Sequence, residues 1–400
     1  MLIGKSIQNF HHNKLFVDNW SVNYEHVNKS DQFEVDNSYS PACCQNKNNQ
    51  CNVLLREKYE GKVSMEEVNY VKNLGHYISN QNNNMIHINQ MRIKAINIKQ
   101  KIFHYLQNLQ VGKYYFECGV ILMKSLLRTS ILYSAETFYN LNEKEIRELE
   151  QIEEDFLRQL LGTQRGCPIP QIYLELGIYP ARFELMKSQI LFYHYIINQK
   201  EDSFILKFLI SQKENPTNKG EWCCVVQSSM EYLNINISDD EMRHIKKQKL
   251  KKVLSDRINE KSLNYLLGIR GSKGKEIKYN RLEMSHYLMP NDSKMSVENK
   301  QYIFSMRNRM IQMSSNFSSE KEKVTCQMGC NEYENQQHIY DCYLYNEKNH
   351  NNKISYKLIY KDNIINQLKI LKTFKENLEK RKLTMENNDN IPRDPIRDPL

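Results

Sequence analysis

The chain has 400 residues, of which only 13 are glycine and 9 are proline, about half of the usual combined share. So few turn-forming residues argue against a β-sandwich, a β-barrel or a doubly wound sheet. Lysine and arginine exceed aspartate and glutamate by 56 to 47, and this net charge of +9 favours an anionic partner such as nucleic acid. The 25 tyrosines and 14 phenylalanines exclude full disorder. We therefore expect a mainly helical protein of about two or three domains.

The sequence shows no targeting or membrane segment. Residues 1–12 hold no apolar run of secretory length. No window approaches the ~18 apolar residues of a membrane-spanning helix. We therefore expect a cytoplasmic or nuclear protein that is neither secreted nor membrane-bound. In that compartment, its 10 cysteines are expected to pack in the core or bind metal rather than form disulfides.

Regular patterning begins near Val63, after an Asn-rich stretch with no clear period. Residues 68–79 mix β-branched and aromatic side chains around Leu74-Gly75, which predicts short strands that meet at a tight bend. Apolar periodicity then predicts three helices, over residues 87–109, 114–139 and 143–161. Three such helices joined by short turns form a small bundle.

The first and third of these helices have an apolar and a polar face. The apolar face of helix 87–109 carries Met91, Ala95, Ile98, Ile102 and Leu106. That of helix 143–161 carries Ile146, Leu149, Ile152, Phe156, Leu157 and Leu160. The polar face of the third helix carries four carboxylates that we expect to lie outside, Glu148, Glu150, Glu153 and Glu154.

Prolines and polar linkers divide the rest of the chain. The stretch TQRGCPIP ends the third helix because its two prolines cannot continue it. Helices resume at 171–176 and 180–198, and helical segments alternate with polar linkers from 203 to 313. The linker GIRGSKGK marks a domain boundary. A cysteine-bearing segment at 324–345 precedes a last helix at 354–382 and a disordered tail.

The sharpest local motif has the spacing C-x3-C-x7-H-x3-C and consists of Cys326, Cys330, His338 and Cys342. Zinc prefers four sulfur or nitrogen ligands in a tetrahedron, and two short ligand pairs can clamp one ion. With four protein ligands the site is closed and structural. So small a segment has little core, so metal binding would supply most of its folding energy. The alternative is that these are unrelated loop and core residues.

Two other groupings have simpler interpretations. Asp239-Asp240 could be a pair of metal ligands, but Ser238 with Glu241 forms a capping box that opens a helix. Cys223-Cys224 lacks metal-ligand spacing, and we expect it to pack.

Basic residues form two groups. Lys94 and Lys101 lie on the polar side of helix 87–109, whereas Arg92 and Lys99 lie within its apolar stripe and need a carboxylate or a phosphate. The second group lies in RHIKKQKLKK and contains Arg243, Lys246, Lys247, Lys249, Lys251 and Lys252. Each group is either a solvated face or a set of phosphate contacts.

The third helix and the residues after it resemble the region that follows the polymerase palm in reverse transcriptases of non-LTR (LINE-like) retrotransposons. In that family, an acidic helix ends in a leucine-rich turn and is followed by a TP-like loop, an LYxELG segment and a Pro-Arg helix. The matching elements here are Phe156–Leu161, Cys167–Pro170, Ile172–Gly177 and Pro180–Phe183. Leu74-Gly75-His76-Tyr77-Ile78 is similar to the family's YLGxxI strand, and the cysteine motif is similar to its C-terminal CCHC knuckle. The resemblance covers about residues 45–382.

The resemblance implies a mainly α fold. Its parts are the degenerate end of a palm with a small β remnant (1–84), a thumb-like helical bundle (85–165), a helical connecting region (166–322), a CCHC zinc knuckle (323–346), a C-terminal helix (347–383) and a disordered tail (384–400). It places Leu74 and Gly75 at a primer-grip-like position. It also implies that the thumb contacts nucleic acid through Arg92, Lys94, Lys99 and Lys101.

The resemblance also implies an incomplete active site. A two-metal polymerase needs carboxylates that converge on two magnesium ions. Phe16–Asn19 is similar to the family's [FY]xDD turn, but Asn19 replaces the second acid, which leaves Asp18 as a remnant. The family's first acidic strand would lie before residue 1. We therefore expect a fragment with structural zinc and with magnesium only if a complete palm exists. It would bind RNA, DNA or an RNA–DNA duplex without polymerisation.

Two alternatives stay open. The sequence could be an incomplete gene model of an active reverse transcriptase, whose palm an upstream exon or frame supplies. It could also be a structural helical zinc-binding protein whose likeness to polymerases arises from leucine-rich helices. The sequence does not predict an oligomeric state.

Overall fold

The computed structural model describes residues 70–73, 76–79, 84–108, 111–138, 141–163, 165–214, 221–271, 277–290, 295–311, 325–326, 328–344, 354–361 and 363–389. The chain divides into two units, Met1–Asn83 and Asn84–Leu400. The described residues are mainly helical, as the composition predicts. Among the described helices, none is long and apolar enough to cross a lipid bilayer.

The described part of the first unit consists of two strands, β1 (Tyr70–Asn73) and β2 (His76–Ser79). They pair antiparallel, with Tyr70 opposite Ser79 and Asn73 opposite His76. Leu74 and Gly75, the primer-grip-like residues, lie outside the described residues, as do Asp18 and the FVDN segment.

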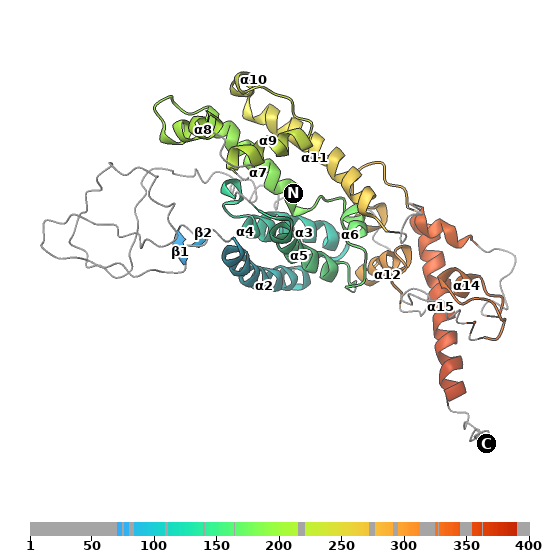
Figure 1. The fold of residues 1–400 in the computed structure, drawn as a ribbon. Coiled ribbons are helices and arrows are strands. Elements are labelled where there is room, and N and C mark those ends of the chain that lie inside the picture. Colours follow the sequence, from blue (N-terminus) through green and yellow to red (C-terminus); the bar gives the residue numbers. More distant parts are fainter. Residues whose placement is uncertain are drawn as a thin grey trace, which may run out of the picture. The chain divides into compact units, whose positions relative to one another are not determined.

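The second unit begins with the helices that we expected to form a bundle. α2 (Met85–Asn108) contacts both α3 (Tyr115–Leu122) and α5 (Glu143–Leu160), as Figure 1 shows. The apolar stripe of α2 is buried as predicted at Met91, Ala95, Ile102 and Leu106. α5 opens with a capping box in which the Asn142 side chain accepts a hydrogen bond from the Glu145 backbone N–H. Sequence periodicity therefore located both helices correctly.

The helix expected at 114–139 is shorter and less regular than predicted. A short 3₁₀ turn, η3 (Gly112–Tyr114), leads into α3, which continues through a π-helical segment, η4 (Met123–Arg128), into α4 (Thr129–Ile131). The chain then turns, with Ser134 in the left-handed region at φ 63°, before a 3₁₀ turn, η5 (Ala135–Thr137). A left-handed serine cannot continue an α-helix, so the prediction of helix up to residue 139 was wrong.

The prediction that the carboxylates of α5 face solvent was also wrong for three of the four. Glu150, Glu153 and Glu154 are at most 2% exposed. Each pairs with an arginine: Arg182 Nε is 2.7 Å from Glu150, Arg128 Nε is 2.9 Å from Glu153, and Arg147 Nη2 is 2.9 Å from Glu154. Because the arginines come from other segments as well as from α5 itself, the hydropathy pattern of one helix could not reveal them.

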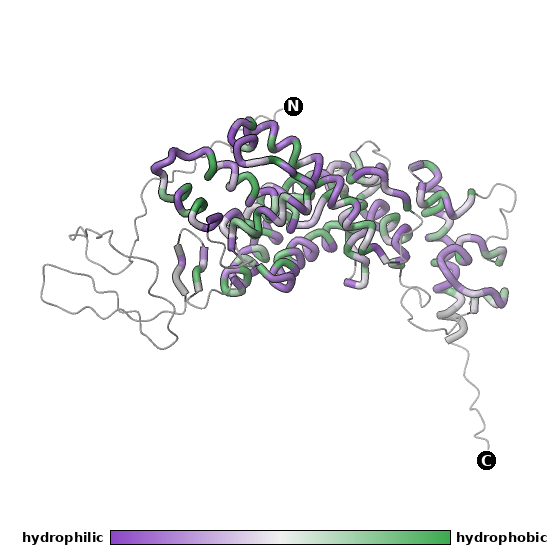
Figure 2. The backbone as a smooth tube through the Cα atoms, turned by 45° about the horizontal axis from the view of Figure 1, so that its top comes forward, coloured by the Kyte–Doolittle hydropathy of each residue, from purple (hydrophilic) through white to green (hydrophobic). Residues whose placement is uncertain are grey.

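Further helices extend the second unit. They are α6 (Ile169–Leu176), α7 (Ala181–Ile197), α8 (Phe204–Glu214), α9 (Trp222–Tyr232), α10 (Asp239–His244), α11 (Lys247–Ile269), η6 (His286–Leu288), α12 (Val297–Arg307), α14 (Gln336–Asp341), η8 (Tyr356–Tyr360) and α15 (Ile364–Asp389). Green and purple residues alternate along most of these helices in Figure 2, as amphipathic helices require. The single helix expected at 354–382 is instead two elements, η8 and α15, because the chain leaves the helical conformation after Tyr360.

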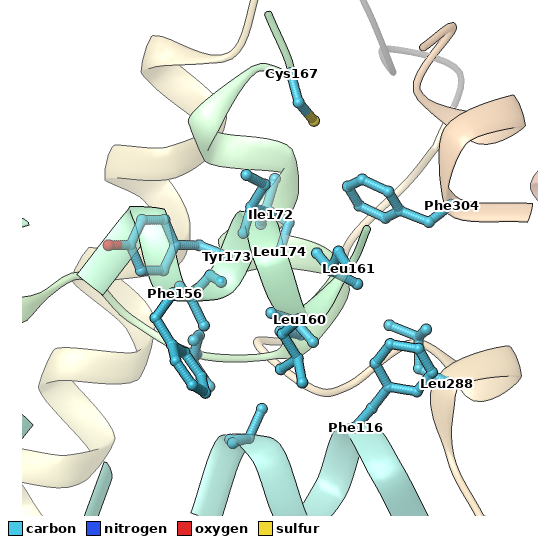
Figure 3. Close-up of a cluster of buried hydrophobic side chains, with 14 of the residues drawn as sticks. Phe116, Phe156, Leu160, Leu161, Cys167, Ile172, Tyr173, Leu174, Leu288 and Phe304 are labelled. Atoms are coloured by element: carbon cyan, nitrogen blue, oxygen red, sulfur yellow. The ribbon is translucent and has the colours of Figure 1, made fainter. Parts of the chain in front are cut away.

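Two clusters of buried side chains hold these helices together. The larger cluster extends from Ile88 to Phe374 and includes residues of α2, α3, α5, α6, α12 and α15. Figure 3 shows side chains from several of these helices converging, among them Phe116, Phe156 and Phe304. The smaller cluster joins α7 to α11 and contains residues such as Tyr193 and Leu254.

The segment that resembles LYxELG is a structural junction. Gly177 has φ 64°, and a Cβ built there would lie 2.1 Å from the Met284 backbone N. The Ser285 N–H donates to the Glu175 carbonyl oxygen at 2.8 Å. Glycine is needed here for its left-handed backbone and because another chain segment approaches so closely.

Candidate metal centre and candidate nucleic-acid interface

The first pair of candidate metal ligands lies on a short, tightly turned loop. Thr325 and Tyr333 form an isolated antiparallel bridge, and the Cys326 N–H donates to the Glu332 carbonyl at 2.9 Å. Gly329 has φ 85°, and its N–H donates to the Cys326 carbonyl at 2.9 Å. Glycine adopts this conformation without steric cost, so the loop can bring the Cys330 thiol back toward Cys326.

The second pair comes from the short helix α14. The Asn335 side chain caps this helix by accepting a hydrogen bond from the His338 N–H at 2.9 Å. The Cys342 N–H donates to the His338 carbonyl at 2.6 Å. Residues four apart on a helical turn lie on the same side, so His338 and Cys342 face the loop together.

The four ligand atoms meet at distances that suit one metal ion. Cys326 Sγ lies 3.9 Å from Cys342 Sγ, which lies 3.8 Å from Cys330 Sγ. Cys330 Sγ lies 3.3 Å from His338 Nε2, and all four atoms lie within 4.8 Å of one another. With Zn–S bonds of about 2.3 Å, two sulfurs of a tetrahedral site lie about 3.8 Å apart, and a sulfur and a nitrogen about 3.6 Å. The cluster is therefore compatible with zinc.

The site is partly shielded from solvent. Cys326 and Cys342 are buried, whereas Cys330 and His338 are half-buried. Without a cation, burial raises the pKa of the Cys326 thiol to about 12. Metal binding would replace this proton, since the thiolate is the ligand form.

The cluster is anchored to α15, which supports α14 through polar contacts. Asn377 Nδ2 donates to the Ile339 carbonyl at 2.8 Å, and Arg381 Nε donates to Glu334 Oε1 at 2.8 Å. Cys326 and Ile339 also belong to the larger hydrophobic cluster. The segment therefore shares a core with the helices before and after it. Sequence reasoning identified the four candidate ligands but missed Asn377 and Arg381, because these lie on a helix with no metal-binding pattern.

A second group of possible ligands contains Glu221, Cys223 and Cys224, whose ligand atoms also lie within 4.8 Å of one another. Cys223 is 2% exposed and belongs to the smaller hydrophobic cluster, and burial raises its thiol pKa. This burial agrees with the expectation that Cys223 packs.

The structure also agrees that Asp239 opens a helix, because Ser238 and Glu241 form the predicted capping box of α10.

The four predicted nucleic-acid contacts on α2 differ in their availability. Lys94 and Lys101 are exposed, and Lys99 is half-buried. Arg92 is half-buried and forms an ion pair with Glu148 of α5, so this cation has found a carboxylate. The helix itself contains no acidic residue. Lys94 and Lys101 are thus the two α2 cations best placed to reach a phosphate.

The second basic group lies at the junction of α10 and α11. Arg243, Lys246, Lys247, Lys249, Lys251 and Lys252 are all exposed. Leu250 and Leu254, which alternate with them, are fully buried in the smaller cluster. The lysines therefore lie on the outer surface of a helix fixed by its apolar side.

Comparisons with known proteins add no identification. The chain matches no protein-family model, no curated protein and no solved structure.

Proposed function

We propose that this chain is a C-terminal part of a non-LTR retrotransposon reverse transcriptase. In this proposal it holds one structural zinc ion and binds RNA, DNA or an RNA–DNA duplex without itself polymerising DNA. The observation that carries the proposal is the convergence of Cys326, Cys330, His338 and Cys342 at tetrahedral spacing. The same four residues form the motif that resembles the family's CCHC knuckle.

The helical junction around Gly177 supports the same assignment. The residues that resemble the family's LYxELG segment include Glu175, which pairs with Arg307 of α12, and Gly177, which touches the backbone at Met284. Because these residues join distant segments through close packing, they must be kept together, which is a physical reason for such a motif to recur in related proteins. The helical thumb-like and connecting regions, with their net positive charge, support binding to a phosphate backbone.

The metal's expected role is structural. Three thiolates and one imidazole fill the four positions of a tetrahedral zinc ion and leave none for substrate. Magnesium catalysis would instead need the palm carboxylates, of which the sequence shows only Asp18 followed by Asn19. We therefore expect no primer extension on an RNA template with magnesium, and robust DNA synthesis would overturn this part of the proposal.

The zinc assignment is tested by the metal content of the purified full chain. We expect about one zinc ion per chain in the wild type, and its loss in Cys330→Ser. Cys330 is the best ligand to replace because it is only half-buried, so the change leaves little cavity. Cys118→Ser, at another half-buried thiol, is the matched control and should retain the metal. A zinc-free wild type, or a Cys330→Ser chain with full zinc content, would contradict the assignment.

Nucleic-acid binding is tested with a labelled RNA–DNA hybrid at low salt. We expect the wild type to bind with an affinity that falls steeply as salt rises. A chain that holds zinc but shows no affinity would favour the alternative of a structural helical zinc protein.

A further inference from the structure

The α10–α11 basic surface is a dense group of cations that form no ion pair within the described part of the chain. We define it as Arg243, Lys246, Lys247, Lys249, Lys251 and Lys252, all of which are exposed. No ion pair joins any of the six to a carboxylate within the described residues. Residues 242–255 contain no Asp or Glu at all.

Two of the three carboxylates at positions 239–241, which directly precede this surface, are already engaged. Asp239 accepts hydrogen bonds from Lys213 and from the Tyr193 hydroxyl, the latter at 2.6 Å. Glu241 accepts the Ser238 N–H at 2.9 Å as part of the helix cap. Arg243 lies close enough to Asp239 to help lower the pKa of that carboxyl, so the positive charge of Arg243 is partly compensated. The five lysines form the uncompensated part.

The lysines are also held close together. Lys247 and Lys251 are one helical turn apart, and Lys249 and Lys252 are three residues apart on the same helix. Like charges at these spacings repel each other and destabilise the helix. α11 nevertheless stays fixed, because Leu250, Leu254 and Ile258 are fully buried. An anionic partner would relieve this repulsion without any change in the fold.

The side chains of α10 and α11 themselves favour a nucleic acid over a lipid surface. An interfacial helix needs apolar side chains that enter the bilayer beside its cations. The exposed large apolar residue in α10 or α11 is Ile269, at the far end of α11. Ile269 is 22 positions from Lys247, or roughly 33 Å along the helix. Within these two helices, the basic end therefore offers charge without an apolar anchor, which suits phosphates that remain in water. The exposed Phe204 and Phe208 lie on α8, and the comparison with anionic vesicles below tests whether they add a lipid contact.

We propose that the α10–α11 basic surface is the main contact for the phosphate backbone of a bound nucleic-acid duplex. This inference rests on the proposed nucleic-acid binding and names the surface that performs it. It places the principal contact on α11 rather than on α2, where only Lys94 and Lys101 are exposed. The contacts are to phosphates, so they confer affinity without sequence preference.

The test compares three full-length proteins binding the labelled RNA–DNA hybrid over a range of salt concentrations. The surface variant carries Lys247→Gln, Lys249→Gln and Lys251→Gln, which preserve helix propensity. The control variant carries the same change at the exposed residues Lys357, Lys369 and Lys372, so both variants lose the same charge. Each duplex phosphate contact contributes about 0.9 to the slope of log K against log salt. The surface variant should therefore lose about 2.7 from this slope.

Each result bears on the proposal. A slope reduced only in the surface variant supports it, provided that the wild type prefers the hybrid to anionic vesicles. Equal effects in the two variants would overturn the inference but leave the proposed function standing, because the wild type still binds. Tighter binding to the vesicles would assign the surface to a membrane. A wild type without affinity for the hybrid would overturn both proposals.

Discussion

The ion pair between Glu175 and Arg307 offers the sharpest test of how the connecting helices are joined. Both side chains are at most 2% exposed, and Arg307 Nε lies 2.9 Å from Glu175 Oε1. Arg307 also donates to the Ile359 carbonyl at 2.9 Å, so one guanidinium links α6, α12 and η8. We predict that Glu175→Gln, which keeps the shape but removes the charge, lowers the free energy of unfolding by ~3 kcal/mol.

The size of this destabilisation follows from the burial of the Glu175–Arg307 ion pair. Removing one partner of a buried pair typically costs ~3–5 kcal/mol, because the other charge stays in the interior without compensation. The lower end applies, since Arg307 keeps its carbonyl partner and lies 5.1 Å from the Tyr287 ring centroid. For a chain of this size, ~3 kcal/mol corresponds to a decrease of about 5 °C in the melting temperature.

Urea denaturation and a double-mutant cycle with Arg307→Met measure this energy. The double variant should be less destabilised than the sum of the two single variants, because the second change removes the uncompensated charge. Arg257→Met is the control, since Arg257 and Glu260 form an exposed pair at 3.2 Å, and such pairs contribute less than ~1 kcal/mol. If Glu175→Gln cost no more than this control, or if the two changes were additive, the reasoning would be refuted.

Two further predictions concern the same unit. Gly177→Ala should lower the free energy of unfolding by more than ~1 kcal/mol, because the alanine Cβ would meet backbone atoms at Met284 and alanine would have to adopt a left-handed backbone. Thermal melts measure this loss against the control Gly268→Ala, where the added Cβ meets nothing within 4 Å. Burial alone would raise the pKa of Glu184, but a hydrogen bond from the Tyr179 hydroxyl helps to lower it below the usual 4.5. Its stabilising contribution is therefore fully present above about pH 4.5 and lost as the pH falls below that value. Glu184→Gln should reduce this acid sensitivity in urea melts at several pH values, and an unchanged pH profile would contradict the assignment.

The elements that sequence periodicity predicted well are those whose pattern is local. The apolar stripe of α2, the capping box of α10 and the proline break before α6 each depend on residues within one or two turns. The four candidate metal ligands, three cysteines and one histidine, were also predictable, because their spacing is itself the motif. The structure brings them within 4.8 Å, although the family resemblance that gave them meaning stays a prediction.

The partners of charged residues were not predictable from the sequence. A carboxylate such as Glu153 looks solvent-facing in a helical pattern, and only Arg128, which is distant in sequence, explains its burial. Likewise, the position of Arg92 within the apolar stripe of α2 indicated that it needs a carboxylate or a phosphate, but only the structure shows that Glu148 of α5 is that partner. Charge pairing depends on which helices meet, and the apolar pattern of one helix does not contain that information.

Sequence patterns alone were enough to predict that this protein is mainly helical, where several helices begin and end, and which four residues can hold a metal ion. These properties follow from short-range periodicity, capping and spacing. The packing of the helices was needed to learn which carboxylates are buried, why residue 177 must be glycine and which cations have no carboxylate partner among the described residues. All three properties depend on contacts between segments far apart in the chain, and only the fold determines which of those segments meet.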